Sequence, residues 1–341
     1  MRGHIDDVQG VVHLPRGQQI ITCSGDGSLR LWDLKSGSQI GEDWKKEEGE
    51  KKVVMNNIAL SPSGKTVVIG SDDRKMRFWD VKMGKLVATW TGHTSYVVSV
   101  CWSANGKHIM SGSWDGMVRV WNVKTGERIL AINTGHEYLW AVLYSPDNTQ
   151  IATGGSNEHA AKIWEVKTGK LLTTLKHHSG VCSLAWTSDG QKLISASLCQ
   201  IGIFNTATWN QIATLEGHQD WVFAITLSHN NRLLASTSFD HTARVWNLDT
   251  NLPVEPPLQH KDRVNSAAFS ANGRVLVTAS RDKNAYTWDI HAILKQAGLE
   301  YLLNAGTNIV SASTNIVDAG TNIVNTRTNI VSANTLPTLG H

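Results

Sequence analysis

Histidine and aspartate recur in this sequence at a fixed separation of 22 residues, and such a pair can perform acid–base chemistry. His4 precedes Asp26, and His93 precedes Asp115. A carboxylate that fixes a histidine beside a hydroxyl is the arrangement of a hydrolytic triad. The same spacing, however, occurs four times along the chain, and catalytic sites are rarely replicated four times in one protein. We therefore interpret these residues as repeated structural polar groups and expect no enzymatic activity.

Sequence motifs that hold metals, nucleotides or cofactors are missing from the sequence. His177 and His178 are adjacent, but neighbouring residues of a strand point to opposite faces. There is no HExxH motif, no C-x-x-C pair, no acidic loop of the calcium-binding type and no P-loop. We expect no metal, no cofactor and no small-molecule substrate.

Tryptophan is frequent: the chain has 14 Trp, against 5 Phe and 5 Tyr. A tryptophan combines a large apolar ring with an N–H donor, so this frequency indicates a repeated structural role. The segment SGSWDGMVRVWNVKTGERIL (111–130) returns in related form six times. The aromatic residues that mark the seven copies are Trp32, Trp79, Trp121, Trp164, Phe204, Trp246 and Trp288, separated by 40 to 47 residues.

Each repeated unit has the pattern of four short strands. Apolar runs such as VVSVCWS alternate with turn signals such as SANG, SPSG and TSDG, and the tripeptide KTG precedes the last run. Four strands in roughly 42 residues is the arithmetic of a propeller blade. The sequence therefore predicts an all-β, seven-bladed β-propeller of four-stranded antiparallel blades over residues 1–290.

The repeats over about residues 3–290 resemble those of the WD40 family. The resemblance implies that His, Ser or Thr, Asp and Trp form a hydrogen-bonded set within a blade, in which Asp fixes the His ring and His positions the hydroxyl. Such buried polar groups must be satisfied internally. Matched by position, the complete sets are His4, Thr22, Asp26 and Trp32; His93, Ser111, Asp115 and Trp121; His218, Ser236, Asp240 and Trp246; and His260, Thr278, Asp282 and Trp288.

Three repeats depart from this pattern. The second has Ile69 in place of the hydroxyl residue and no matching His, and the fourth has Glu158 in place of Asp. The fifth has Cys199 in place of Asp and Phe204 in place of Trp, and Phe cannot donate a hydrogen bond. We expect blades two, four and five to depend mainly on apolar packing.

Charge and cysteine content give little sign of a nucleic-acid or membrane partner. The formal net charge is +3, so direct nucleic-acid binding is not expected. Four arginines recur two residues before the third-strand aromatic, where we expect a solvated or rim-facing column: Arg30, Arg77, Arg119 and Arg244. The sequence has no signal-peptide pattern and no apolar run of membrane-spanning length, and four unpaired cysteines fit a reducing compartment. We expect an intracellular protein of the cytoplasm, the nucleus or both.

The resemblance also implies where a protein partner would bind. In WD40 proteins the loops at one rim, the top face, commonly dock other proteins. The residues that the pattern places there are Tyr96, Trp114, Tyr138, Trp140, Trp221, Phe223, Phe239, Arg263 and Arg281. Because Trp, Tyr and Arg are enriched in interface hot spots, we expect a scaffold that binds partner peptides, including one with an Arg or Lys over a ring. Packing between blades, a subunit of a nucleic-acid or chromatin complex, and a propeller-based enzyme remain the alternatives.

The two ends of the chain differ from the repeats. WD40 proteins usually complete the last blade with a strand that precedes the first Gly-His, and here only two residues precede it. Either residues 291–303, which have the pattern of a short amphipathic helix, cover that edge, or blade seven has three strands, or the sequence is incomplete. Residues 304–341 contain a seven-residue TNIV repeat, for which we expect a mostly disordered low-complexity tail.

Overall fold

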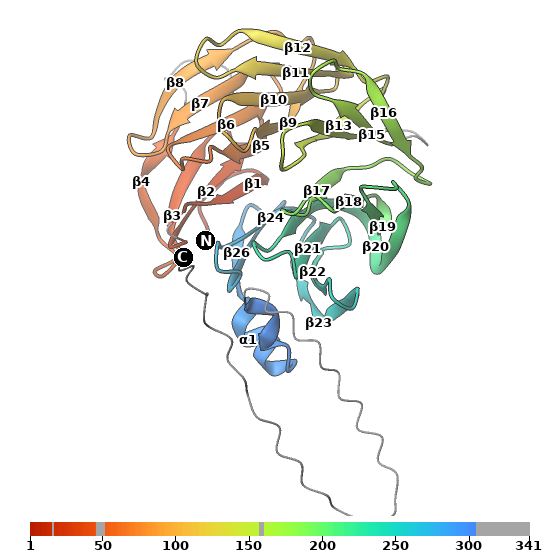
Figure 1. The fold of residues 1–341 in the computed structure, drawn as a ribbon. Helices are drawn as coiled ribbons and strands as arrows, with labels where there is room; N and C mark the ends of the chain where they lie inside the picture. The colour runs from red at the N-terminus through yellow and green to blue at the C-terminus, as the bar shows by residue number, and fades with distance from the viewer. Residues whose placement is uncertain (16, 46–51, 157–159, 305–341) are drawn as a thin grey trace, which may run out of the picture. The chain divides into compact units, whose positions relative to one another are not determined.

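The alternating apolar runs form strands that assemble into antiparallel sheets. A computed structural model describes residues 1–15, 17–45, 52–156 and 160–304. One structural unit covers Met1–Gly306, and a second, Thr307–His341, lies outside the described residues together with the expected tail. Figure 1 shows the sheets of the first unit following one another around a ring, from β1 in red to β26 in blue.

The first four blades are separate four-stranded sheets. Blade one comprises β1 (Val8–His13), β2 (Gln19–Ser24), β3 (Leu29–Asp33) and β4 (Gln39–Trp44). Blade two comprises β5 (Met55–Leu60), β6 (Thr66–Ser71), β7 (Met76–Asp80) and β8 (Lys85–Trp90). Blade three comprises β9 (Val97–Trp102), β10 (His108–Ser113), β11 (Met117–Asn122) and β12 (Arg128–Asn133). Blade four comprises β13 (Leu139–Tyr144), β14 (Gln150–Gly155), β15 (Ala161–Glu165) and β16 (Leu171–Leu175).

Blades five and six share one long strand and therefore form a single seven-stranded sheet. This strand is β20 (Gln211–Leu227), whose first part pairs with β19 and whose last part pairs with β21. The other strands are β17 (Ser183–Trp186), β18 (Lys192–Ala196), β19 (Leu198–Asn205), β21 (Leu233–Ser238), β22 (Thr242–Asn247) and β23 (Leu252–Gln259). Blade seven comprises β24 (Val264–Phe269), β25 (Val275–Ser280) and β26 (Ala285–Asp289), followed by α1 (Ile290–Gln296) and the 3-10 helix η1 (Glu300–Leu303).

The ring is closed by the packing of each blade on its two neighbours. The first strands of successive blades contact one another in the order β1, β5, β9, β13, β17, β20 and β24, and β24 contacts β1. A separate cluster of buried apolar side chains lies at each junction between blades. The last junction joins Val277 and Ala279 of blade seven to Val8 and Trp32 of blade one. Residues up to about 270 positions apart therefore share one core.

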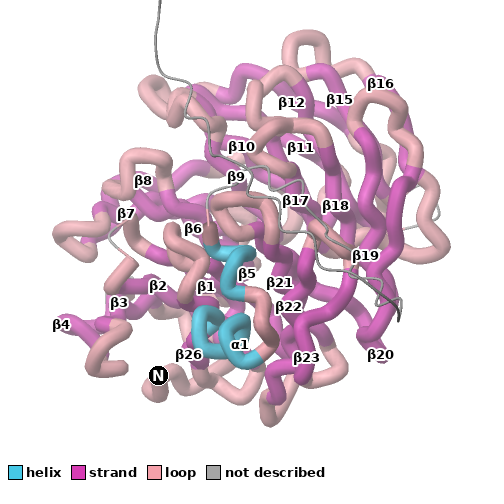
Figure 2. The backbone as a smooth tube through the Cα atoms, turned by 60° about the horizontal axis from the view of Figure 1, so that its bottom comes forward, coloured by secondary structure: helices cyan, strands magenta, loops and turns pink. Residues whose placement is uncertain are grey.

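Blade seven has three long strands and a short pairing at its outer edge. The amino group of Met1 donates to the Ala285 carbonyl at 2.8 Å, and Arg2 forms an isolated bridge with Asn284. The helix α1 lies next to β26 (Figures 1 and 2) and buries Ile290 and Leu294 in the apolar cluster between blades six and seven. Of the three sequence-based interpretations of this edge, the described residues thus have the three-stranded blade, with α1 covering a junction between blades.

Three blades contain a continuous hydrogen-bonded set of the predicted His, hydroxyl, Asp and Trp residues. In blade six, His218 Nδ1 lies 2.7 Å from Asp240, His218 Nε2 lies 2.7 Å from Ser236 Oγ, and the Trp246 N–H donates to the same hydroxyl at 2.8 Å. Blades one and three have the corresponding contacts between 2.8 and 3.1 Å. Each set therefore ties the third strand to the second, and both to the loop that precedes the blade.

The carboxylates of these sets are held in their ionised form. Burial raises the pKa of Asp240, but hydrogen bonds from His218, from Thr242 and from the Gln219 N–H outweigh it and hold the pKa well below its usual range. The pKa values of Asp26 and Asp115 are lowered in the same way by their histidine partners. An ionised aspartate has no proton to donate at neutral pH, so these residues act as hydrogen-bond acceptors that hold their blade together.

In blade seven the predicted set is changed at the aspartate. His260 Nε2 contacts the Thr278 hydroxyl at 2.7 Å and the Trp288 N–H donates to that hydroxyl at 3.0 Å, as in the other blades. His260 Nδ1, however, lies 3.0 Å from the Leu258 carbonyl, and Asp282 accepts a hydrogen bond from the Tyr286 hydroxyl. Tyr286 also packs edge-on against His260. The phenol has therefore replaced the imidazole as the partner of Asp282.

The blades that lack a complete set retain more polar contacts than the sequence predicted. Blade four keeps His136 and Trp164 on the Thr153 hydroxyl, at 3.3 and 3.0 Å, while Glu158 lies outside the described residues. Blade five keeps a 2.7 Å contact between His177 and Ser195. Buried apolar clusters also lie on both blades, so these contacts add to the expected apolar packing and do not replace it. Each retains a His–hydroxyl contact that does not depend on the substituted Asp position.

The predicted solvated arginine column is also wrong. Arg77, in blade two, is 2% exposed and donates to Ser71 at 2.7 Å and to Asp73. Arg119 is buried against Asp115 at 2.9 Å, and Arg30 is buried against Asp43. Arg244 pairs with Glu255 at 3.0 Å. These guanidinium groups pair with carboxylates of the preceding turn or of the outer strand of their own blade, and therefore do not form a free basic surface.

Trp246→Phe and Trp79→Phe make a matched test of the polar sets, since both rings are buried. The Trp246 N–H donates to Ser236, whereas Ile69 stands where blade two would have a hydroxyl, and the Trp79 N–H has no partner in the described part of the chain. Trp246→Phe should lower the free energy of unfolding by about 1 kcal/mol more than Trp79→Phe, because only it breaks a hydrogen bond. Urea unfolding at pH 7 measures the difference, and equal losses would contradict this account of the sets.

Buried neutral histidines should make the fold sensitive to mild acid. Burial lowers the pKa of His13 to about 4 and that of His136 to about 4. An unfolded histidine titrates near 6.5, so between about pH 6.5 and pH 4 the unfolded chain binds protons that the folded chain does not bind. The free energy of unfolding therefore falls as the pH drops through this range. His13→Gln should reduce this slope by up to about 1.4 kcal/mol per pH unit. Urea unfolding of both proteins between pH 6 and pH 4.5 measures this slope. The same slope in His13→Gln as in the unchanged chain would refute the account of His13 as a buried neutral histidine.

Candidate functional site

The loops that join the blades meet the turns between second and third strands on one side of the ring, which we call the top face. Backbone hydrogen bonds tie each pair together at the same place in successive blades. The Trp114 N–H donates to the Tyr96 carbonyl at 3.0 Å, and the Phe239 N–H donates to the Trp221 carbonyl at 3.0 Å. The repeat therefore places two side chains per blade at this rim, one at the start of the first strand and one in the turn.

Three aromatic rings from blades three and four form a ladder on the top face. Tyr96 and Trp114 have ring centroids 5.1 Å apart, and Trp114 meets Tyr138 edge-on at 5.7 Å. The three side chains are 44%, 38% and 44% exposed. Rings of this size that contact one another and still face solvent on a folded surface are typical of a site that binds another molecule.

A second aromatic group lies further towards the centre of the ring. Trp140 of blade four meets Trp221 of blade six edge-on at 5.8 Å, and Phe223 stacks on Phe239 at 5.2 Å. The Arg263 guanidinium lies 4.4 Å from the centre of the Phe239 ring. This contact covers one face of Phe239 with a cation from this chain itself.

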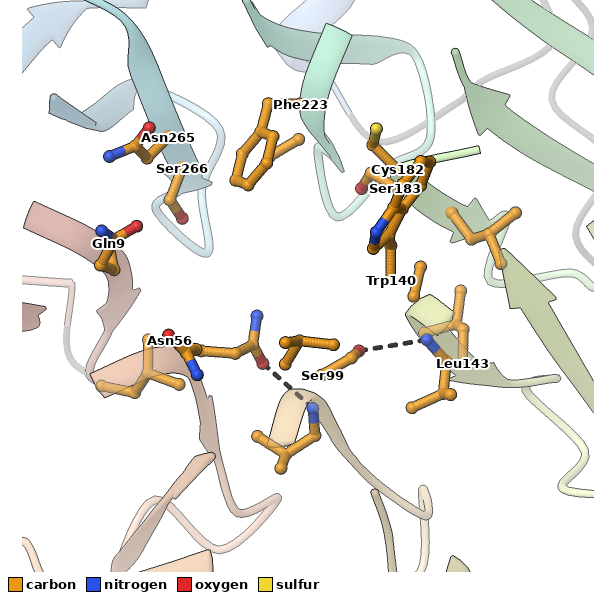
Figure 3. Close-up of a pocket in the computed structure, with 18 of the residues that line it drawn as sticks. Gln9, Asn56, Ser99, Trp140, Leu143, Cys182, Ser183, Phe223, Asn265 and Ser266 are labelled. Carbon is orange, nitrogen blue, oxygen red and sulfur yellow. Dashed lines mark hydrogen bonds between the residues drawn. The ribbon is translucent and has the colours of Figure 1, made fainter. Parts of the chain in front are cut away.

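A cavity of about 570 Å³ opens between the first strands of all seven blades. Figure 3 shows Phe223, Trp140 and Cys182 on one side of it and Gln9, Asn56, Asn265 and Ser266 on the other. Of the nine residues that the sequence predicted as partner-binding, five line this cavity: Trp114, Trp140, Trp221, Phe223 and Phe239. The cavity is therefore the centre of the predicted top-face site.

The other four predicted residues lie outside the cavity lining. Tyr96 and Tyr138 extend the site outwards through Trp114, and Arg263 reaches it through Phe239. Arg281 is exposed and lies 3.5 Å from the Asp7 carboxylate on the adjacent blade. Arg281 is thus separate from the aromatic group with which the sequence had placed it.

The residues predicted to bind a partner did not include the polar side of the cavity. Gln9, Asn56 and Asn265 occupy the second position of the first strand in blades one, two and seven, the position that carries Trp140 in blade four and Phe223 in blade six. Aromatic residues were singled out as hot spots, and their amide counterparts at the same repeat position were passed over. The shared repeat position indicates that these amides line the cavity, because the ring brings all seven copies of that position to one opening.

Among the residues that the structure describes, those that line the cavity carry no imidazole, carboxylate, ammonium or guanidinium group. The ionisable side chains among them are thiols, and burial raises the pKa of Cys182 to about 12 and that of Cys101 to about 11. These thiols are therefore neutral at physiological pH. Hydroxyls lie in the same lining, but Ser99 accepts from the Val142 N–H at 3.1 Å and Ser183 accepts from the Ile225 N–H at 3.1 Å, so both belong to contacts between blades.

Two further features bear on the kinds of site in the described part of the chain. Its histidine, cysteine and acidic side chains form no group of three or more placed to hold a metal ion. Its helices are too short and too polar to cross a bilayer.

The chain is similar to proteins that carry the same repeats. The B-type cell cycle switch protein ccs52B of Medicago truncatula is 27% identical over 124 residues, or 35% of this chain and 26% of that protein. The anaphase-promoting complex subunit cdh1 of Dictyostelium discoideum is 28% identical over 113 residues, or 32% and 15%. The human WD repeat and SOCS box-containing protein 1 is 33% identical over 114 residues, or 31% and 26%. The chain thus spans about a quarter or less of the length of these relatives.

Family membership is shown over most of the sequence. The WD domain, G-beta repeat model matches residues 1–33, 47–80, 84–122, 127–165, 169–205, 209–247 and 257–289. These seven matches correspond to the seven blades of the structure, including the two blades that share β20. The chain therefore belongs to the WD40 repeat family and folds as its seven-bladed β-propeller.

Proposed function

We propose that this propeller is a non-catalytic interaction scaffold that binds a segment of a partner protein on its top face. The observation that carries the proposal is the aromatic surface around the central cavity. Seven aromatic side chains from blades three, four and six lie there, in contact with one another and partly exposed. Fold alone does not assign a function, so the proposed binding role depends on the chemistry of this site.

The chemistry of the site favours binding over catalysis. A hydrolase or transferase needs a nucleophile beside a base, or an acid placed to protonate a leaving group. The described residues of the cavity lining offer neutral thiols and hydroxyls, with no imidazole or carboxylate among them. The His–Asp pairs that resembled catalytic groups are buried away from the cavity, in the strand-to-strand hydrogen bonds of each blade.

A protein partner is better supported than nucleic acid. Nucleic-acid binding depends on free cations that neutralise phosphates, and Arg30, Arg77 and Arg119 are buried beside carboxylates. One similar protein is named as a subunit of the anaphase-promoting complex, which is a protein assembly. A role within a multiprotein complex is consistent with that similarity.

Replacing the central rings should abolish partner binding and leave the fold intact. Trp140→Ala and Trp221→Ala remove large rings from the cavity lining, and each should lower the captured amount of bound partners about tenfold or more. The measurement is quantitative mass spectrometry of proteins purified with the tagged chain. Circular dichroism of each variant establishes that the propeller is folded.

Leu172→Ala is the matched control. Leu172 is 49% exposed on β16, the outer strand of blade four, so its removal also deletes exposed apolar surface. Capture should be unchanged in this variant. A top-face site would be refuted if the two folded tryptophan variants retained partners at the wild-type level. It would also be refuted if only Leu172→Ala lost them.

A further inference from the structure

The central cavity has two chemically different walls, and the division follows blade order. At the repeat position of Gln9, three consecutive blades of the ring carry carboxamides and the other four carry apolar side chains. Blades seven, one and two have Asn265, Gln9 and Asn56 there. Blades three to six have Val98, Trp140, Cys182 and Phe223 there. Because the ring is closed, the two sets face each other across one opening (Figure 3).

The carboxamide wall has hydrogen-bonding capacity left over. Asn56 donates its Nδ2 hydrogen to the Val97 carbonyl at 3.2 Å, and Asn265 donates to the Val8 carbonyl at 3.1 Å. Both contacts run between blades and fix the orientation of each amide. The carbonyl oxygens of both asparagines accept no hydrogen bond from the residues that the structure describes, and neither end of the Gln9 amide is paired with them. This wall can therefore accept N–H groups and donate to a carbonyl.

The apolar wall is suited to an uncharged side chain. Trp140, Trp221 and Phe223 offer large rings, and an aliphatic side chain buried against them is stabilised because its apolar surface leaves water. A lysine or arginine inserted here would lose its hydration, and the described residues of the lining offer it no carboxylate. The Arg263 guanidinium on Phe239 adds a positive charge beside the cavity mouth, which opposes a second cation. The structure thus argues against the cationic side chain that the aromatic residues had suggested.

We propose that the cavity takes an uncharged segment of the partner, with one apolar side chain against the tryptophan wall and adjacent peptide or side-chain amides against the carboxamide wall. This inference rests on the proposed function and specifies the ligand chemistry of the same site. The cavity volume of about 570 Å³ lies within the range of roughly 300–1,000 Å³ of specific ligand pockets and accommodates a short piece of extended chain. The charged residues of the partner lie outside the cavity, over the rim.

The test uses peptides selected without assumption about the natural partner. A phage-displayed library of random dodecapeptides is panned on the folded chain, and clones that also bind Trp140→Ala are removed. Each selected sequence is made as a fluorescent peptide, and its Kd is measured by fluorescence polarisation. We expect an apolar residue beside Asn, Gln or Gly as the shared feature, and we expect replacement of that apolar residue by Lys to weaken binding at least tenfold.

Gln9→Glu isolates the role of charge, because it changes the carboxamide wall by one charge at constant shape. It should weaken the apolar peptide several-fold and reduce the penalty for the Lys peptide. His178→Gln, an exposed change away from the cavity lining, is the control and should alter neither Kd.

Three results would overturn the inference: selected peptides that require Lys or Arg, equal affinities for the selected peptide and its Lys replacement, or no peptide that depends on Trp140. The first two leave the scaffold proposal intact if partner capture still depends on Trp140 and Trp221. Loss of that dependence in the capture experiment instead refutes the scaffold proposal itself, so the two failures are distinguishable.

Discussion

Closure of the ring is the constraint on which the rest of the structure depends. A single blade has two apolar faces and cannot bury either alone, whereas seven blades bury both faces of each by packing on two neighbours. The junction between blades seven and one, where Val277 meets Trp32, is formed by the two ends of the described repeats and completes this core. The buried His–hydroxyl–Trp contacts then fix blades one, three, four, six and seven internally, because burial leaves those polar atoms no water to bind.

Ring closure also creates the candidate site. Seven residues about 42 positions apart in the sequence, among them Gln9, Trp140 and Phe223, have no reason to meet until the first strands surround one axis. In the closed ring, differences between the repeats give one cavity two chemically different walls, with amides from blades seven, one and two and apolar groups from the other blades. Because these positions face the opening, the differences between repeats there determine which chemical groups a bound molecule meets.

The sequence predicted the fold well because the signal is repeated seven times. The spacing of aromatic and polar residues indicated seven blades, and five of nine predicted site residues line the cavity. The predictions that failed concern individual contacts between side chains. Arginine alternates with apolar residues on the third strands, which suggested a solvated column, but Asp73 and Asp43 offer Arg77 and Arg30 buried ion pairs that no periodicity reveals. Likewise Tyr286 displaces His260 at Asp282, a choice between two donors that depends on geometry.

Hydrogen–deuterium exchange of the chain, alone and with a captured partner, tests the central claim that the top-face cavity holds the partner. The account predicts slower exchange at the starts of the first strands and at the adjoining turns, in particular around Trp114, Trp140, Trp221 and Phe239, with no change in the outer strands β8, β12 and β16. Slower exchange confined to those outer strands or to α1, with the residues around the cavity unchanged, would contradict it.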